Sequence, residues 1–396
     1  KLMTVGDFYK KRYNRTIELA SAAAISISYL GWSSANLVAL GIVIHTVSGN
    51  AITLEQGIVL GAVIVGVYTL FGGMWSVAFT DLFQTVIIVA GLIYIAWMLA
   101  GMAGGVDKVV ATAQASDRLK FFPGASLHDW LGFIAAFVTM ALGSVAQQDV
   151  FQRVTSARTE KIARQGTLLG GSLYLLMAFI PMFIAVSALL IDPAMVKQML
   201  SNENDFQQVL PTLILQRTPL FAQVLFFGAL LSAILSTASG TLLAPTAVLT
   251  ENVIQPLWGH KLSDRKMLVL LRLILIGFTC CVTLFALQSE SSMYQMVQDA
   301  YKVTLVAAFT PLVFGMFWRR ATPQGALLSM ACGVVAWQYA EHFMADALVP
   351  PQLVGLGSAI AGMVVGSLAP TLMGGQGPPE IVDLARQPEV ADNPPA

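Results

Sequence analysis

The stretch GALLSAILSTASGTLLAPTAVLTENVIQP, from Gly228 to Pro256, guides the interpretation of the whole chain. It is long enough to cross a bilayer, and its single charged residue is an acid near its end. Three hydroxyl-bearing residues lie near its middle: Ser236, Thr237 and Ser239. Hydroxyls on a lipid-buried helix must face something polar, so this segment predicts a helix that lines a polar site inside a membrane protein.

The spacing of these residues places them on one face of the helix. Ala233, Ser236 and Thr237 are related as i, i+3 and i+4, which are neighbours on a helical surface. A backbone carbonyl and two hydroxyls are the oxygen ligands that a small hard cation such as sodium accepts. Alternatively, the hydroxyls bond back to the preceding turn and let helices pack closely. The spacing alone leaves both interpretations open.

The composition indicates a polytopic membrane protein. Of the 396 residues, 56% are hydrophobic and 11% are charged, whereas soluble domains carry about 25% charged residues. The formal net charge is zero, so nothing suggests a nucleic-acid partner. The three cysteines, Cys280, Cys281 and Cys332, fall in apolar runs and are expected to be buried and reduced.

Hydropathy divides the chain into a membrane domain, residues 1–373, and a tail, residues 374–396, that is expected to be disordered and cytoplasmic. A short amphipathic helix is expected in NDFQQVLPTLILQ, either as an external lid or as a connector. The ten predicted spans lie at about 17–45, 54–72, 77–101, 128–147, 167–191, 219–250, 266–287, 294–318, 323–347 and 351–373.

Basic residues predict the orientation of the chain. They concentrate at alternate ends of the spans, in the set that includes both chain ends, and the positive-inside rule therefore places both ends in the cytoplasm. The chain begins at Lys1 without a methionine or signal sequence, and we expect an N-terminal truncation.

Asp81 is the first ionisable residue expected at membrane depth. It lies in GGMWSVAFTDLFQ, near the start of the third predicted span. An unpaired carboxylate there is costly unless it meets water, a cation or a basic residue. The alternative is an acid that caps a helix start, where the helix dipole favours negative charge.

Lys302 lies near the middle of a predicted span, with Gln298 at i−4 and Asp299 at i−3 on the same side of the helix. A Lys–Asp pair neutralises itself, and a lysine can also extend its stem toward the interface. In the functional interpretation, Gln298 and Lys302 line a polar cavity and Lys302 pairs with a substrate carboxylate.

Other parts of the sequence exclude some functions. Asp149 and Arg153 are i, i+4 partners at the end of a span and are expected to be exposed interfacial structure. The chain contains no Walker-type loop, nucleophile elbow or metal-ligand cluster, so we expect neither an enzyme nor an ATP-driven pump, and no cofactor.

Five segments together resemble the sodium/solute symporter family, which includes the proline, galactose and sialic acid symporters. The resemblance extends to about Met373. The segments are LMTVGDFYKKRY, LFGGMWSVAFTDLFQ, Gln148 with Gln152-Arg153, SAILSTASGTLLAPTAVLTENV and GMFWRRATPQGA.

The resemblance implies an all-α fold of the leucine-transporter type with five-plus-five inverted repeats, of which about ten spans are in this chain. It implies sodium ligands at Ala233, Ser236 and Thr237, with Asp81 in sodium release or a second sodium site and Ser239 beside it. Gln298 matches a substrate-binding position of sugar-transporting relatives. Gly143 and Ser144 occupy the position of an aromatic gate, so Ser144 is a further substrate-site candidate. The family's first core helix, which supplies the other half of its sodium site, is not in this chain.

We therefore expect a sodium-coupled symporter that imports a small organic solute across the bacterial inner membrane. Lys302 favours an anionic solute. The expected partners are sodium, the solute and membrane lipid, and the protein is expected to be monomeric. The alternatives are the membrane sensor module of a histidine kinase and a proton-coupled or uncoupled carrier of the same fold.

Overall fold

The computed structural model describes residues 2–201, 206–258, 262–344 and 347–372, which form helices and loops with no strand among them. The predicted all-α class is confirmed, and the predicted tail, 374–396, lies outside the described residues. The α-helices are α1 (Val5–Arg12), α2 (Arg15–Val47), α3 (Leu54–Met102), α4 (Val106–Ala115), α5 (Leu127–Gly143), α6 (Gln148–Thr155), α7 (Glu160–Ile191), α8 (Pro193–Leu200), α9 (Val209–Arg217), α10 (Leu220–Val248), α11 (Asp264–Gln288), α12 (Met293–Thr304), α13 (Thr310–Phe317), α14 (Pro323–Phe343) and α15 (Pro351–Leu372).

Within the described residues, nine helical segments are long and apolar enough to cross a membrane. The ninth predicted span, 323–347, corresponds to α14, which has 21 residues but falls outside that set. The spans predicted separately at 54–72 and 77–101 lie on one 49-residue helix, α3. At 1.5 Å per residue this helix measures about 73 Å along its path, more than one crossing of a bilayer needs.

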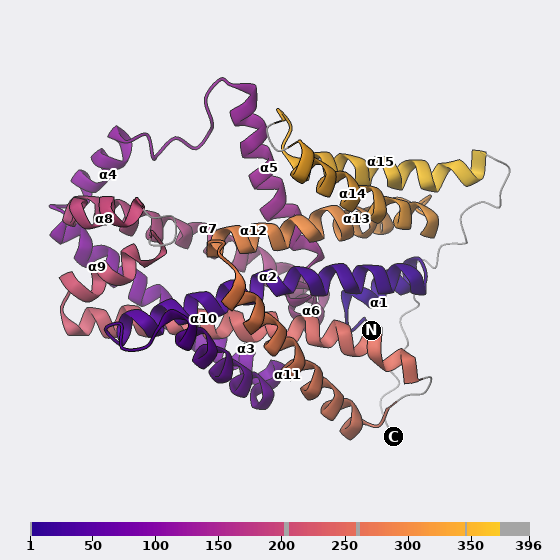
Figure 1. The fold of residues 1–396 in the computed structure, drawn as a ribbon, viewed down its shortest axis with the longest axis horizontal. Coiled ribbons are helices and arrows are strands. Elements are labelled where there is room, and N and C mark those ends of the chain that lie inside the picture. Colours follow the sequence, from indigo (N-terminus) through magenta and orange to yellow (C-terminus); the bar gives the residue numbers. More distant parts are fainter. Residues whose placement is uncertain (1, 202–205, 259–261, 345–346, 373–396) are drawn as a thin grey trace.

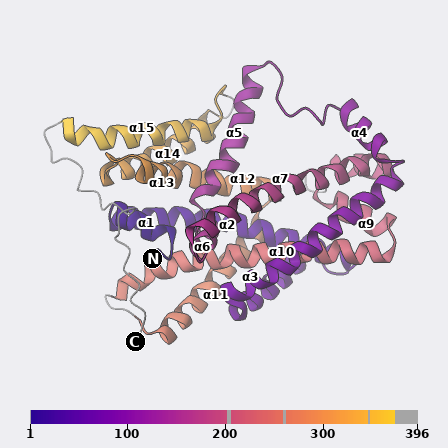
Figure 2. The same ribbon diagram turned by 180° about the vertical axis from the view of Figure 1, so that it is seen from behind.

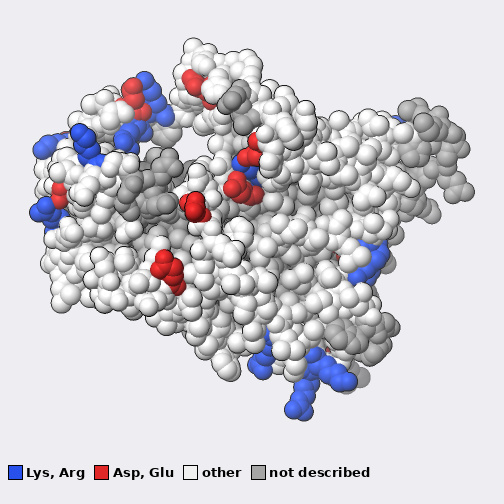
Figure 3. All heavy atoms as spheres, viewed as in Figure 1, with Lys and Arg blue, Asp and Glu red and all other residues white. Residues whose placement is uncertain are grey.

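Helix α2 lies at the centre of the bundle. It packs against α3, α10, α11 and α12, and Tyr29 on it is fully buried (Figure 1). Seen from behind, α7 and the second half of α3 extend away from this centre toward α4 (Figure 2). On the face drawn in Figure 3, most Lys and Arg side chains lie toward the ends of the molecule, whereas several Asp and Glu side chains lie nearer the middle.

Pro245 interrupts the backbone hydrogen bonds of helix α10. A proline has no backbone N–H, so the carbonyl of Thr241 loses its usual partner four residues on. Ser33 of α2 donates its hydroxyl to that carbonyl at 3.0 Å. The sequence thus creates an acceptor on one helix and supplies its donor from another, which fixes α2 against α10. A π-helical turn, Leu249–Ile254, then ends α10.

Helices α14 and α15 lie side by side in both ribbon views and pack through small residues (Figures 1 and 2). A Cβ on Gly366 would stand 2.9 Å from the Cα of Gly325, and one on Gly333 would stand 2.9 Å from the Cβ of Ala359. Such close approach is typical of helix pairs in membranes, where small residues let backbones meet.

Two of the three cysteines are not buried as expected. Cys280 and Cys281 are exposed on the surface of α11, whereas Cys332 on α14 is partly buried. An apolar helix in a bilayer turns part of its surface to lipid, so an apolar run does not by itself predict burial in protein.

The short helix α1 packs against α13 and the turn before it. Arg12 Nε donates to the carbonyl of Gly315 at 2.8 Å, and Tyr9 donates its hydroxyl to the carbonyl of Ala308 at 2.7 Å. The last carbonyls of a helix have no intrahelical partner, and a cation is favoured at that end by the helix dipole. Arg12 therefore caps α13.

The amide of Asn252 joins α1 to the ends of α2 and α10. Its Oδ1 accepts from the hydroxyl of Thr4 at 2.7 Å. Its Nδ2 donates to Glu18 Oε1 at 2.8 Å and to Asp7 Oδ1 at 3.1 Å. Asn252 and Glu18 are both buried, so these bonds form in a poorly solvated region where each lost partner is costly.

The helix predicted in NDFQQVLPTLILQ is present as α9, preceded by a short 3₁₀ turn. Arg217 at its end donates two hydrogen bonds to Asp192, which also caps the start of α8 by accepting from the backbone N–H of Met195 at 3.1 Å. The two short helices are thus joined to the end of α7 by one carboxylate.

This carboxylate makes the α8–α9 region sensitive to acid. Hydrogen bonds from Arg217 hold the pKa of Asp192 below its ordinary value. A depressed carboxyl pKa stabilises the folded form at neutral pH, and that stabilisation is lost as the pH falls below the ordinary value of about 3.9 and through the folded pKa. Amide hydrogen exchange in α9 should therefore accelerate over that acidic range.

The matched variant is Asp192→Asn, which keeps an acceptor for the α8 cap and removes the charge. It should exchange faster than the parent at neutral pH and show no acid-dependent step in α9. An unchanged step in the variant would assign the acid sensitivity to another group.

Candidate functional site

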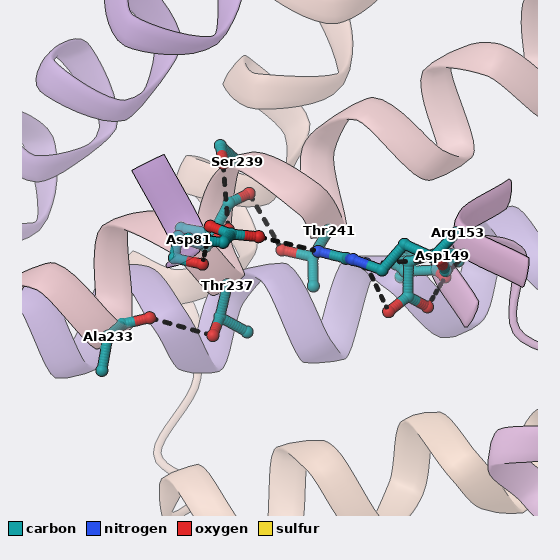
Figure 4. Close-up of polar contacts among 10 residues, drawn as sticks. Asp81, Asp149, Arg153, Ala233, Thr237, Ser239 and Thr241 are labelled. Atoms are coloured by element: carbon teal, nitrogen blue, oxygen red, sulfur yellow. Dashed lines mark hydrogen bonds and ion pairs between the residues drawn. The ribbon is translucent and has the colours of Figure 1, made fainter. Parts of the chain in front are cut away.

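Ala233, Ser236 and Thr237 lie together on α10. The hydroxyls of Ser236 and Thr237 make different contacts. Thr237 donates to the carbonyl of Ala233 at 2.9 Å (Figure 4). Ser236 instead donates to Asp81 Oδ1 on α3 at 2.5 Å. Thr237 therefore bonds back along its helix, as the structural interpretation expects, whereas Ser236 reaches a carboxylate, and the interpretation as cation ligands stays a prediction. The oxygen of each hydroxyl keeps lone pairs that can coordinate a cation.

Asp81 lies inside α3, not at a helix start, because that helix begins at Leu54. The interpretation of Asp81 as a helix cap is therefore wrong. The carboxylate meets Ser236 through Oδ1, and its Oδ2 lies 3.9 Å from Nη2 of Arg153. With 26% of its side chain exposed, Asp81 is accessible from one side.

Ser239 lies within one turn of these residues on α10 and is fully buried. Its hydroxyl donates to the carbonyl of Ser236 at 2.9 Å, so it is directed along its own helix (Figure 4). Its role as a cation ligand stays a prediction, as do the roles of the other candidates.

The predicted i, i+4 pair of Asp149 and Arg153 is present and Arg153 is exposed, but Asp149 is not. Asp149 is 7% exposed and accepts a hydrogen bond from the Tyr29 hydroxyl, which in turn accepts from the Asp149 backbone N–H at 2.9 Å. Arg153 Nη1 lies 3.3 Å from Asp149 Oδ2. Tyr29 is a functional candidate that the sequence analysis missed, and its only signal is a phenol inside a predicted span.

A pocket of about 320 Å³ opens beside this network. It is partly polar and lies where α3, α6 and α10 meet. Asp81 and Arg153 both reach it, so the pocket presents one acidic and one basic group. The residues that line it are Ala78, Asp81, Gln152, Arg153, Ser156, Gly240 and Leu243.

The substrate-site candidates lie on α12 and at the end of α5. Lys302 is buried and pairs with Asp299 at 3.0 Å and with Glu341 of α14 at 3.1 Å. Trp337 holds the same carboxylate, donating from Nε1 to Glu341 Oε2 at 2.9 Å. The charge of Lys302 is thus already met by two carboxylates, which removes its argument for an anionic solute.

Ser144 lies in the short turn that follows α5. Its hydroxyl donates to the carbonyl of Ala141 at 3.0 Å, and the neighbouring Gly143 carbonyl accepts from Thr304 of α12 at 2.8 Å. Gln298 is half-buried near the middle of α12. Ser144 therefore lies beside the C-terminal end of α12, whereas Lys302 is directed toward α14.

Comparison with known proteins decides the family. The family model described as "Sodium:solute symporter family" matches residues 1–333. The chain belongs to the sodium:solute symporter family.

Several curated members of the family are similar to this chain. The high-affinity proline transporter PutP of Bacillus subtilis is 26% identical over 85% of this chain and 70% of its own length. The sodium/pantothenate symporter of Haemophilus influenzae is 23% identical over 92% of this chain and 75% of its own. The high-affinity choline transporter 1 of Torpedo marmorata is 24% identical over 84% of this chain, which spans 57% of that relative.

The fold is also that of a solved family member. A Na⁺-coupled sialic acid symporter in a substrate-bound outward-open state superposes with a TM-score of 0.76 at 17% identity, over 92% of this chain and 77% of the other. The predicted leucine-transporter-like fold and the prediction of a sodium-coupled solute symporter are confirmed at the level of the family. Neither alternative, a kinase sensor module or a proton-coupled carrier, gains support from these relatives.

Proposed function

We propose that this symporter imports a small organic solute together with sodium across the bacterial inner membrane. Its C-terminus is cytoplasmic in this proposal, because the basic residues of the chain concentrate at the ends of the spans on that side. The relatives are named for proline, pantothenate and choline, so the solute class stays broad. Sodium, the solute and lipid are its partners, it works as a monomer, and it requires no cofactor and no catalytic step.

The contact between Asp81 and Ser236 carries the proposal. It joins a carboxylate on α3 to the hydroxyl face of α10, with the Ala233 carbonyl and the Thr237 hydroxyl one turn away. Oxygen ligands and one net negative charge suit a monovalent cation better than a solute of mixed polarity. The energy comes from the sodium gradient and from the membrane potential, which supplies about 2.3 kcal/mol per charge for each 100 mV.

Uptake into proteoliposomes tests this function. Solute uptake should require an inward sodium gradient and should stop when potassium chloride replaces sodium at equal ionic strength. An inside-negative potential should accelerate uptake of a neutral or cationic solute, because net positive charge then enters with it. Uptake that is equally fast without a sodium gradient would contradict the proposal.

A ligand screen on the purified protein identifies the solute. Sodium-dependent thermal stabilisation of the purified protein is screened with amino acids, short carboxylates and sugars, since a ligand of the folded state raises its apparent stability. The compounds that stabilise only in the presence of sodium are then used as radiolabelled solutes.

A further inference from the structure

Arg153 is placed between two carboxylates that belong to different helices. Its Nη1 lies 3.3 Å from Oδ2 of Asp149 on its own helix, α6, and its Nη2 lies 3.9 Å from Oδ2 of Asp81 on α3 (Figure 4). The second distance is too long for a hydrogen bond but close enough for direct electrostatic attraction. Arg153 is therefore bound to Asp149 and only approaches Asp81.

The surroundings hold the first contact and leave room for the second. Tyr29 donates to the other oxygen of Asp149, so this carboxylate is fixed in position. Gly240 on α10 lets the guanidinium pass, because a Cβ there would stand 2.9 Å from Nη2 of Arg153. Arg153 is also 45% exposed on the pocket, so its side chain has space to move toward Asp81.

Asp81 can neutralise one cation at a time. A sodium ion held by Asp81 and Ser236 would repel the guanidinium, and the guanidinium can complete its approach only when the ion is gone. A carboxylate left without a cation at membrane depth is costly. Asp81 would therefore need a positively charged partner in both halves of a transport cycle.

We propose that Arg153 is a built-in counter-cation, which replaces sodium at Asp81 after the ion leaves toward the pocket and so lets the empty carrier return. This inference rests on the proposed sodium coupling. It assigns Arg153 a positioning role, with two measurable consequences. The guanidinium competes with sodium for Asp81, and it speeds the step in which the carrier carries neither sodium nor solute.

The first test compares sodium affinity, measured as the sodium dependence of the thermal stability of the purified protein. Arg153→Gln should raise sodium affinity by about three- to fivefold, the range expected for loss of a partly exposed ion pair. Asp149→Asn should change it in the opposite direction, because it frees Arg153 to move toward Asp81. Arg153→Lys keeps the charge and should restore an affinity near that of the parent.

The second test separates the steps of the cycle in proteoliposomes. Arg153→Gln should slow net uptake, which needs return of the empty carrier, and should preserve exchange of labelled for unlabelled solute with sodium on both sides. A merely structural role would lower both rates together and would not raise sodium affinity. If Arg153→Gln fails to fold, a weaker sodium affinity in Asp149→Asn together with a parent-like affinity in Arg153→Lys still decides the question.

The outcomes distinguish this inference from the function on which it rests. A parent protein without sodium-dependent stabilisation or uptake would remove both. Sodium-dependent uptake by the parent, with unchanged or weaker sodium affinity in Arg153→Gln, would overturn the counter-cation role alone.

Discussion

An Asp81→Asn variant is expected to need about 10 to 100 times more sodium for half-maximal uptake than the parent. The substitution keeps an acceptor for the Ser236 hydroxyl, which now lies at 2.5 Å, and removes only the negative charge. An interaction with a charged partner in a partly buried site contributes about 1.5–3 kcal/mol, which corresponds to this factor. The measurement is the sodium dependence of initial uptake rates at a saturating concentration of the solute.

Two variants control for this effect. Asp107→Asn removes an exposed acid from the first turn of α4, away from α10, and should leave the sodium dependence unchanged. Ser236→Ala removes the partner of Asp81 and one of the proposed oxygen ligands, and should also weaken sodium dependence. An Asp81→Asn variant with the sodium dependence of the parent would exclude Asp81 from the cation site.

Replacing Asn252 by alanine is expected to destabilise the protein by about 3 kcal/mol. The side chain makes three hydrogen bonds, with Thr4, Glu18 and Asp7, and two of these go to carboxylates. Alanine leaves these partners in a buried region without the amide that joins them. The variant should show a melting temperature several degrees below that of the parent in the same detergent.

The matched control is Asn36→Ala on α2. The amide of Asn36 donates to the carbonyl of Trp32 one turn earlier, so the hydrogen bond that this variant loses lies within α2. Equal melting temperatures for the two variants would contradict the role of Asn252 in holding α1 to α2 and α10.

The sequence was sufficient to predict features that depend on one helix. The face formed by Ala233, Ser236 and Thr237 follows from a period of 3.6 residues, and the cost of a carboxylate at membrane depth singles out Asp81. The family resemblance added the fold, since long helices by themselves do not specify how they pack. The roles of these residues in binding remain predictions.

Contacts between distant segments could not be predicted in this way. Asp149 looked exposed because its i+4 neighbour offered a sufficient partner, and its burial depends on Tyr29, which lies 120 positions earlier. Lys302 looked available for a solute because Asp299 is its only acid within one turn, whereas Glu341 lies on another helix, 39 positions later. The helical period describes the neighbours within a helix and carries no information about the helix packed against it.

The contacts of α1 have a consequence for the order in which the molecule assembles. Arg12 caps a helix whose Gly315 carbonyl lies 303 positions further along the chain, and Thr4 bonds to Asn252, 248 positions away. A ribosome adds about 5–20 residues per second, so α1 waits about 15–60 s before α13 has been synthesised. Contacts of such long range form late, after the spans between them are in place. A segment synthesised well before α13 is thus among the last to reach its final position, and a chain interrupted before α13 would leave α1 without its partners on that helix.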